Sequence, residues 1–257
     1  MPADDELATS QRRALLGSIA GTLLGLGADH RLLVAVDGVD GSGKTTFADE
    51  LATEIRRRDR PVIRASTDSF HRPAAERHRR GRASPEGFYR DSYDYTRLRS
   101  ELLIPCSRGG SGVYRDAIFD VDDDRPVVGM ARLAQPDALA IVDGLFLHRP
   151  ELVGYWDFSI FLDVKFQISI PRGAARGPGY GSPDPTASMQ SPAQLFAAGA
   201  VGGKRHITGK SHHLSHQCHA AAPQGWPLWK LTLTRPALTL PAGTPPAGRC
   251  SPVSVAW

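Results

Sequence analysis

The sequence predicts an α/β fold, in which a doubly wound and mostly parallel sheet carries helices on both faces. Continuous apolar runs closed by glycine or a polar residue are typical of strands that are buried on both sides. Such runs occupy residues 31–38, 61–67, 137–144 and 158–164. Residues 45–58 follow the first run with apolar side chains at helical spacing, and residues 96–105 indicate a helix that ends at Pro105. Strands that alternate with helices form parallel β-α-β units.

Two segments fall outside this alternation. Residues 1–30 contain an apolar, glycine-rich stretch after Arg12 and Arg13, which resembles a signal peptide. Acidic residues precede the arginines, and the stretch is too short and too glycine-rich to cross a membrane. We therefore expect a surface helix that packs on the domain, and no membrane partner. Residues 71–87 are polar and arginine-rich, and we expect a mobile loop there.

The charge distribution divides the chain at Asp184. All 27 acidic residues lie at or before Asp184, together with 25 of the 31 Lys and Arg residues. The last 73 residues carry six basic residues and no acidic one, and Pro and Gly interrupt nearly every stretch. We predict an N-terminal helical segment over residues 1–30, a core over residues 31–184, and a basic, low-complexity, disordered tail over residues 185–257.

A glycine-rich motif follows the first predicted strand. Gly38-x4-Gly43-Lys44-Thr45 fits the phosphate-binding loop pattern, between a strand and a helix as that loop requires. Glycines let backbone N–H groups converge on an anion, and the helix adds its positive N-terminus. Lys44 can contact the β- and γ-phosphates, and the Thr45 hydroxyl can ligate Mg²⁺. The predicted ATP site comprises Gly38, Asp40, Gly41, Ser42, Gly43, Lys44, Thr45 and Thr46.

Carboxylates end two further strands. Asp68 follows the second strand and Asp143 closes the third, and strand carboxyl ends line the ligand crevice of a doubly wound sheet. A carboxylate at Asp68 can take a proton from an acceptor hydroxyl or hold metal, and Asp143 can organise Mg²⁺. Arg172 and Arg176 are four residues apart, so on a helix they could close over transferring phosphates. Turn aspartates and a solvated basic patch are the alternatives.

Taken in order, six segments resemble the uridine kinase and pantothenate kinase branch of the P-loop kinases. They are VAVDGVDGSGKTT, TDSFHRP, GFYRDSYDYTRL, GVYRDAIFDV, AIVDGLFL and PRGAARG, within residues 32–184. The resemblance implies a P-loop NTPase fold and ATP- and Mg²⁺-dependent phosphoryl transfer to a small molecule. It implies that Asp68 is the catalytic base, that Asp143 serves the metal, and that Arg172 and Arg176 are lid arginines.

The resemblance also implies acceptor contacts. Tyr114 matches a tyrosine that contacts the acceptor in both branches, and Asp91 and Asp94 fall where nucleoside kinases hold the ribose. Nucleoside kinases have a histidine five residues after that tyrosine, where this chain has Phe119. The pantothenate branch has one two residues after it, where this chain has Asp116. We expect a nucleoside such as uridine as acceptor, with a pantothenate-type kinase or a nucleotide-binding regulator without acceptor chemistry as alternatives.

The tail departs from this family, whose members continue after the lid with a charged helix and an apolar strand. We find neither after Asp184, which suggests a reading-frame change near codon 185; a genuine basic appendage is the competing interpretation. We do not expect the tail to bind nucleic acid, because its aromatic residues are sparse. Its histidine cluster lacks a helix or knuckle that would position zinc ligands. The cluster comprises His212, His213, His216, Cys218 and His219.

The cysteines bear on the compartment of the protein. The chain has three, which are far apart and form no CxxC motif or disulfide pattern. This usage is typical of a reducing environment, so we expect a cytoplasmic enzyme.

Overall fold

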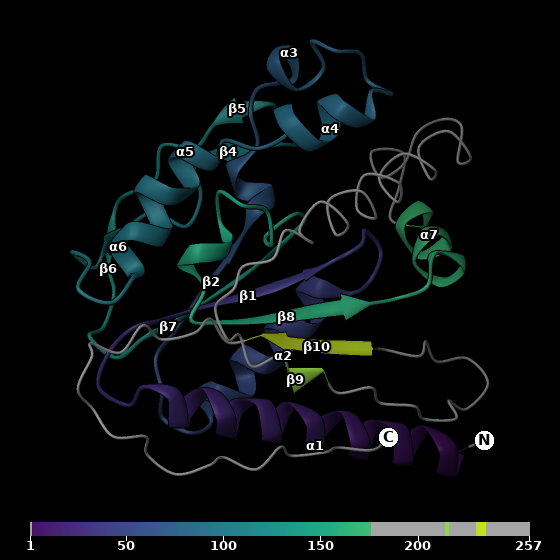
Figure 1. The fold of residues 1–257 in the computed structure, drawn as a ribbon, viewed down its shortest axis with the longest axis vertical. Helices are drawn as coiled ribbons and strands as arrows, with labels where there is room; N and C mark the ends of the chain where they lie inside the picture. Colours follow the sequence, from purple (N-terminus) through teal and green to yellow (C-terminus); the bar gives the residue numbers. More distant parts are fainter. Residues whose placement is uncertain (1, 176–213, 216–229, 235–257) are drawn as a thin grey trace.

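The computed structural model describes residues 2–175, 214–215 and 230–234. Its centre is a sheet in which four parallel strands lie in the order β2–β7–β1–β8 (Figure 1). Their bounds are Leu32–Gly38 for β1, Val62–Ser66 for β2, Leu139–Gly144 for β7 and Phe158–Asp163 for β8. The four runs predicted as strands are therefore strands, and the doubly wound α/β fold is confirmed.

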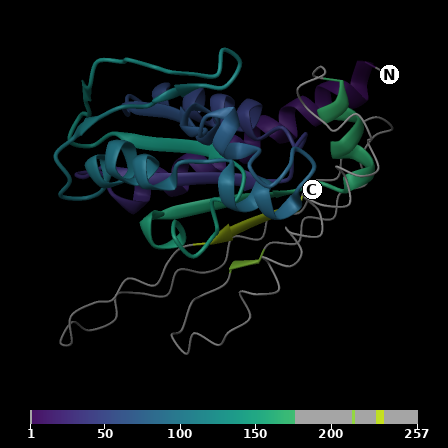
Figure 2. The same cartoon turned by 90° about the horizontal axis from the view of Figure 1, so that it is seen from above.

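The sheet continues beyond β8 by two strands that the sequence did not predict. β10 (Lys230–Thr234) pairs antiparallel with β8, and β9 (Leu214–Ser215) pairs with β10. Figure 2 shows β10 beside β8 from above. The expectation that nothing after Asp184 supplies a further strand is thus wrong. The segment KLTLT alternates polar and apolar residues as an edge strand does, a signal too short to detect among prolines and glycines. The rest of the predicted tail, with its histidine cluster, lies almost wholly outside the described residues.

Helices cover both faces of the sheet, as Figure 1 shows. On one face α1 (Pro2–Leu26) packs on α2 (Lys44–Arg56), and Leu23 and Phe47 lie in one core cluster with Val34 and Ile141 of the strands. On the other face a helical segment runs through α5 (Tyr95–Leu98), the π-helical η2 (Arg99–Leu103) and α6 (Ile104–Cys106). Leu98, Leu102 and Leu103 of this segment are fully buried.

Two helical predictions need correction. The helix expected to end at Pro105 runs to Cys106, because the π-helical turn before Pro105 already interrupts the regular hydrogen-bond ladder that a proline would break. Residues 71–87, expected as a mobile loop, contain α3 (Ala74–Arg77) and the start of α4 (Pro85–Asp91). The Ser84 hydroxyl caps α4 by accepting from the backbone N–H of Gly87, and Pro85 opens the helix.

Short elements complete the described chain. Two small ribbons pair β3 (Val113–Tyr114) with β6 (Arg132–Leu133), and β4 (Phe119–Asp120) with β5 (Arg125–Pro126). The 3-10 turns η1 (Thr67–Phe70) and η3 (Val153–Tyr155) follow β2 and precede β8, and α7 (Phe166–Ala174) follows β8. Within the described residues no helix combines the length and apolar character needed to cross a bilayer.

Candidate active site

The candidate active site begins at the turn between β1 and α2. The glycines of this turn adopt backbone conformations that other residues rarely adopt, with φ of 70° at Gly41 and 86° at Gly43. A Cβ atom on Gly41 would also collide with the backbone carbonyl of Ser169 in α7. The turn is therefore a tight glycine loop that opens directly onto the N-terminus of α2, as the sequence motif predicted.

Lys44 lies at the start of α2 and is only 8 % exposed. Its ammonium group donates to the backbone carbonyl of Val39 at 2.9 Å, within the same loop. Burial lowers the pKa of Lys44, and the charges of Asp40, Asp37, Asp68 and Asp143 oppose that shift. The structure thus brings the predicted loop lysine and the two predicted strand-end carboxylates into one electrostatic group.

Asp143 at the end of β7 is 1 % exposed and accepts two hydrogen bonds. The Thr45 hydroxyl donates to its Oδ2 at 2.8 Å, and the Arg64 guanidinium donates to its Oδ1 at 2.9 Å. Arg64 belongs to β2, and it also donates to Asp49 and to the carbonyl of Ile141. Because the Thr45 proton points to Asp143, the lone pairs of that hydroxyl are left for a ligand. Arg64 was not among the predicted site residues, because only the strand register shows that it lies beside Asp143.

Asp68 stands in η1, two residues beyond the end of β2, with an exposed side chain. The Tyr93 hydroxyl donates to its Oδ1 at 3.3 Å. The Nδ1 atom of His71 lies 2.8 Å from the backbone carbonyl oxygen of Asp68. Burial lowers the pKa of His71. Neither Tyr93 nor His71 was among the predicted site residues, although both stand in segments that carried the family resemblance.

A series of hydrogen bonds from Asp37 through His148 to Ser159 stabilises the end of β1, where the glycine loop begins. Asp37 at the end of β1 is 1 % exposed, and its Oδ1 accepts from the backbone N–H of Gly38 at 2.7 Å. Its Oδ2 accepts from the backbone N–H of His148 and lies 2.7 Å from Nδ1 of that ring. The other ring nitrogen of His148 lies 2.9 Å from the Ser159 hydroxyl of β8. These hydrogen bonds therefore connect β1, β8 and the segment after β7 beneath the loop. No sequence motif indicated this connection.

The helix that carries the first of the two arginines predicted for a lid lies against the glycine loop. α7 lies beyond the carboxyl end of β8, and a Cβ atom on Gly173 would approach Asp40 Oδ2 to 3.5 Å. The neighbouring Arg172 is exposed in the last turn of α7. The structure thus places Arg172 on a helix that contacts the loop. Arg176 lies outside the described residues.

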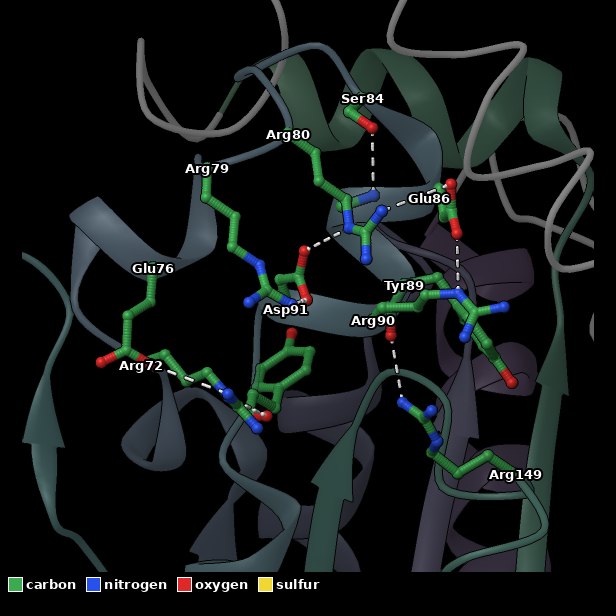
Figure 3. Close-up of polar contacts among 12 residues, drawn as sticks. Arg72, Glu76, Arg79, Arg80, Ser84, Glu86, Tyr89, Arg90, Asp91 and Arg149 are labelled. Carbon is green, nitrogen blue, oxygen red and sulfur yellow. Dashed lines mark hydrogen bonds and ion pairs between the residues drawn. The ribbon is translucent and has the colours of Figure 1, made fainter.

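The residues predicted to contact the acceptor have other partners. Arg79 and Arg80 donate to opposite oxygens of Asp91 at 2.6 and 2.8 Å (Figure 3), and the hydrogen bond from Arg79 is the main cause of the lowered pKa of Asp91. Asp94 caps α5 by accepting from the backbone N–H of Arg97 at 2.9 Å. Tyr114 lies on β3, buried beside Asp116 and Arg132, and burial raises its pKa.

These groups fit the chemistry of a nucleoside triphosphate with Mg²⁺. The glycine turn leaves no room for side chains where backbone N–H groups must approach an anion, and it ends at a helix N-terminus. Lys44 supplies a cation, and Thr45 with Asp143 supplies the oxygen ligands that a hard cation prefers. Within the described residues no cluster of three His, Cys, Asp or Glu side chains forms a metal site of protein ligands alone.

Two solved structures share the fold of this chain. One, from Bacillus stearothermophilus, is provisionally designated a uridine kinase; it is 23 % identical, has a TM-score of 0.54, and aligns over 65 % of this chain and 90 % of its own. The other, from Silicibacter sp. TM1040, is provisionally designated a fructose transport system kinase, with 22 % identity, a TM-score of 0.55, and coverage of 71 % and 94 %. The chain thus has the fold of P-loop kinases of the uridine kinase type, as the motifs indicated.

Sequence comparison adds nothing to this assignment. No model of a known protein family matches the chain, and no curated protein matches it.

Proposed function

We propose that this chain transfers the γ-phosphoryl group of ATP to a hydroxyl of a small molecule, and that the acceptor is a nucleoside such as uridine. One observation carries the proposal. The loop lysine Lys44 lies within electrostatic reach of Asp68 and Asp143, the carboxylates that end two neighbouring strands. A nucleotide binder without acceptor chemistry has no need of an exposed carboxylate at Asp68.

The loop and α2 would bind the triphosphate. Backbone N–H groups of residues 38–46 cradle the phosphates, and the Lys44 ammonium exchanges its bond to the Val39 carbonyl for phosphate oxygens. Thr45 and Asp143 would hold Mg²⁺, with the Thr45 proton directed to the carboxylate. Bound Mg²⁺ would neutralise charge on the β- and γ-phosphates.

Asp68 would act on the acceptor. Its carboxylate takes the proton of the acceptor hydroxyl while the oxygen of that hydroxyl forms a bond to the γ-phosphorus. The bond from that phosphorus to the bridging oxygen breaks, and ADP retains the electron pair. Lys44 and Arg172 oppose the charge that spreads over the phosphoryl oxygens, and Arg176 would join them from beyond the described residues. Positioning and electrostatics thus supply most of the catalysis.

The identity of the acceptor is the most specific part of the proposal. Phe119, at the position where nucleoside kinases have a histidine, is buried in β4. Asp116, at the position of the pantothenate-branch histidine, pairs with Arg132 at 2.7 Å. Neither position supplies an imidazole, so neither acceptor pattern is complete. A pantothenate-type acceptor is the alternative, which the segment GFYRDSYDYTRL favours.

Transfer of labelled γ-phosphate from ATP and Mg²⁺ tests the proposal. The acceptor panel is uridine, cytidine, adenosine, pantothenate and no acceptor, and the Lys44→Ala variant is the blank. We expect labelled product with a nucleoside. Product with pantothenate alone would replace the nucleoside assignment. ATP binding without transfer to any acceptor would contradict the enzymatic proposal and favour a nucleotide-binding regulator.

A further inference from the structure

Asp68 stands in a segment that is paired to a distant part of the chain. Residues 70–72 and 92–94 run antiparallel, with the N–H of Arg72 donating to the carbonyl of Ser92 at 2.9 Å. The N–H of Asp94 donates to the carbonyl of Phe70 at 2.8 Å. We call this pairing the strap. It lies two residues beyond Asp68, so it fixes the backbone on one side of the carboxylate.

Tyr93 is the central residue of the strap and is held from several directions. It is 2 % exposed, and its ring centroid lies 4.5 Å from that of His71 and 5.8 Å from that of Tyr95. Arg72 donates from Nε to its backbone carbonyl at 3.1 Å. A side chain with so little freedom presents its hydroxyl at a fixed point. That point is 3.3 Å from Asp68 Oδ1.

The protonation of Tyr93 suits a donor. Burial and the charge of Asp68 together raise its pKa well above the ordinary range, so the phenol keeps its proton at neutral pH. A phenol donor to a carboxylate is a charge-assisted hydrogen bond. At 3.3 Å this bond is longer than the optimum for such a pair, so its contribution is to orient the carboxylate. The exposed Asp68 side chain otherwise has few constraints on its rotation. Because Tyr93 holds Oδ1 of Asp68, the other carboxylate oxygen, Oδ2, is directed away from Tyr93.

We propose that Tyr93 is a positioning residue for Asp68: its hydroxyl fixes Oδ1 and leaves Oδ2 free to accept the proton of the acceptor hydroxyl. The inference rests on the proposed function, because it presumes that Asp68 is the base. It assigns to the buried face of the strap a role beyond packing. The role requires the phenol oxygen, which a phenylalanine of the same shape lacks.

Tyr93→Phe tests this directly, because it removes the hydroxyl and keeps the ring contacts with His71 and Tyr95. We expect kcat to fall about tenfold, the effect of losing one hydrogen bond to a charged group, while KM for ATP changes less than about twofold. Tyr95→Phe is the matched control: it deletes a hydroxyl from a buried tyrosine of the same cluster, whose ring lies against Arg149. Its kcat should stay at the wild-type value. An unchanged kcat in Tyr93→Phe, or equal losses in the two variants, would overturn the proposal.

A double-mutant cycle separates positioning from general stability. In an Asp68→Ala background the hydroxyl of Tyr93 has no carboxylate to hold, so Tyr93→Phe should lower the residual rate less than about twofold. A second full tenfold loss would show that Tyr93 acts independently of Asp68, and would contradict the proposal.

A spectroscopic measurement on the full chain needs no acceptor. Tyrosines are labelled with ¹³C at Cζ, and the Tyr93 signal is the one that disappears in Tyr93→Phe. Asp68→Ala should displace this signal and leave that of Tyr95 in place; a stationary Tyr93 signal would refute the contact. If the wild type transfers phosphate to no acceptor while the Tyr93 signal still responds to Asp68→Ala, the proposed function fails and the contact stands.

Discussion

The carboxylate of Asp143 accepts hydrogen bonds from two neighbouring side chains. One oxygen accepts from the Thr45 hydroxyl and the other from Arg64, and both bonds lie in a nearly solvent-free position. A buried carboxylate is costly unless such donors satisfy it, so Arg64 stabilises the charged form of Asp143, which the proposed metal site requires. The same pairing explains how a basic residue can stand on a strand of the central sheet.

Arg64→Met should destabilise the fold. It leaves Asp143 without its cation, and breaking a buried ion pair from one side typically costs about 3–5 kcal/mol. Arg57→Met is the control, because Arg57 is 68 % exposed and pairs loosely with Glu54 at 3.6 Å; such a pair contributes less than about 1 kcal/mol. Urea unfolding measures both, and similar free energies of unfolding for the two variants would show that the pair at Asp143 adds little.

Asp68→Asn should separate chemistry from binding. The amide keeps the shape of the side chain but cannot take the acceptor proton, so we expect kcat to fall by about two to four orders of magnitude. The affinity for ATP should stay near the wild-type value, because the substitution leaves the proposed triphosphate site, the glycine loop with Lys44, unchanged. Steady-state kinetics and nucleotide titration measure the two quantities. Turnover at the wild-type rate would exclude Asp68 from the role of base.

Among the elements, α1 supports α2 mainly by apolar packing, beside an ion pair between Arg12 and Glu50 and a hydrogen bond from Arg58 to the carbonyl of Gly17. Four of its apolar side chains lie in the same core cluster as Phe47, Leu51 and Ile55 of α2, and through α2 they support the glycine loop. They are Leu16, Ile19, Ala20 and Leu23. α1 therefore acts as a second layer behind the helix whose N-terminus follows the glycine loop.

Leu23→Ala tests the contribution of α1. Leu23 is fully buried, and truncating such a leucine typically costs about 2–5 kcal/mol of unfolding free energy. Val128→Ala serves as the control, because Val128 is fully exposed and its truncation removes little buried surface. Thermal or urea unfolding gives both values. If Leu23→Ala proved as stable as Val128→Ala, the packing of α1 on α2 would not contribute to the fold in solution.

At the scale of the whole molecule, the reactivity of Cys106 can measure global unfolding, because this thiol is buried in the core. It lies in the core cluster that joins the α5–α6 segment to the sheet and is fully buried. Burial raises its pKa from 9.0 to about 11. The thiol is thus protonated in the folded chain at neutral pH, and it deprotonates more readily once unfolding exposes it.

A thiol reagent should therefore label Cys106 slowly at pH 8, where about one thiol in a thousand is ionised, and quickly in urea. The measurement uses a Cys218→Ser, Cys250→Ser background, so that Cys106 alone reacts. The folded thiol has the higher pKa, so ionisation should also lower stability as pH rises from 9 to 11. Rapid stoichiometric labelling at pH 8 without denaturant would contradict a closed core.

The sequence by itself determined the four parallel strands, the glycine loop with Lys44 and Thr45, and the carboxylates Asp68 just after β2 and Asp143 at the end of β7. These features depend on local spacing: apolar runs, a loop pattern, and the residue that follows each strand. The cap at Ser84 was also a local signal, though one that the arginine-rich composition of residues 71–87 outweighed.

Only the tertiary structure decided which side chains meet. Arg64 reaches Asp143 because β2 and β7 are neighbours, His148 reaches Asp37 across the loop entry, and Tyr93 reaches Asp68 through the strap. Nor did the sequence place β10 beside β8. These partners stand 25 to 111 residues apart, and no local pattern encodes such a pairing. Strand order and register bring them together, because burying the two faces of the sheet fixes where each strand end must lie.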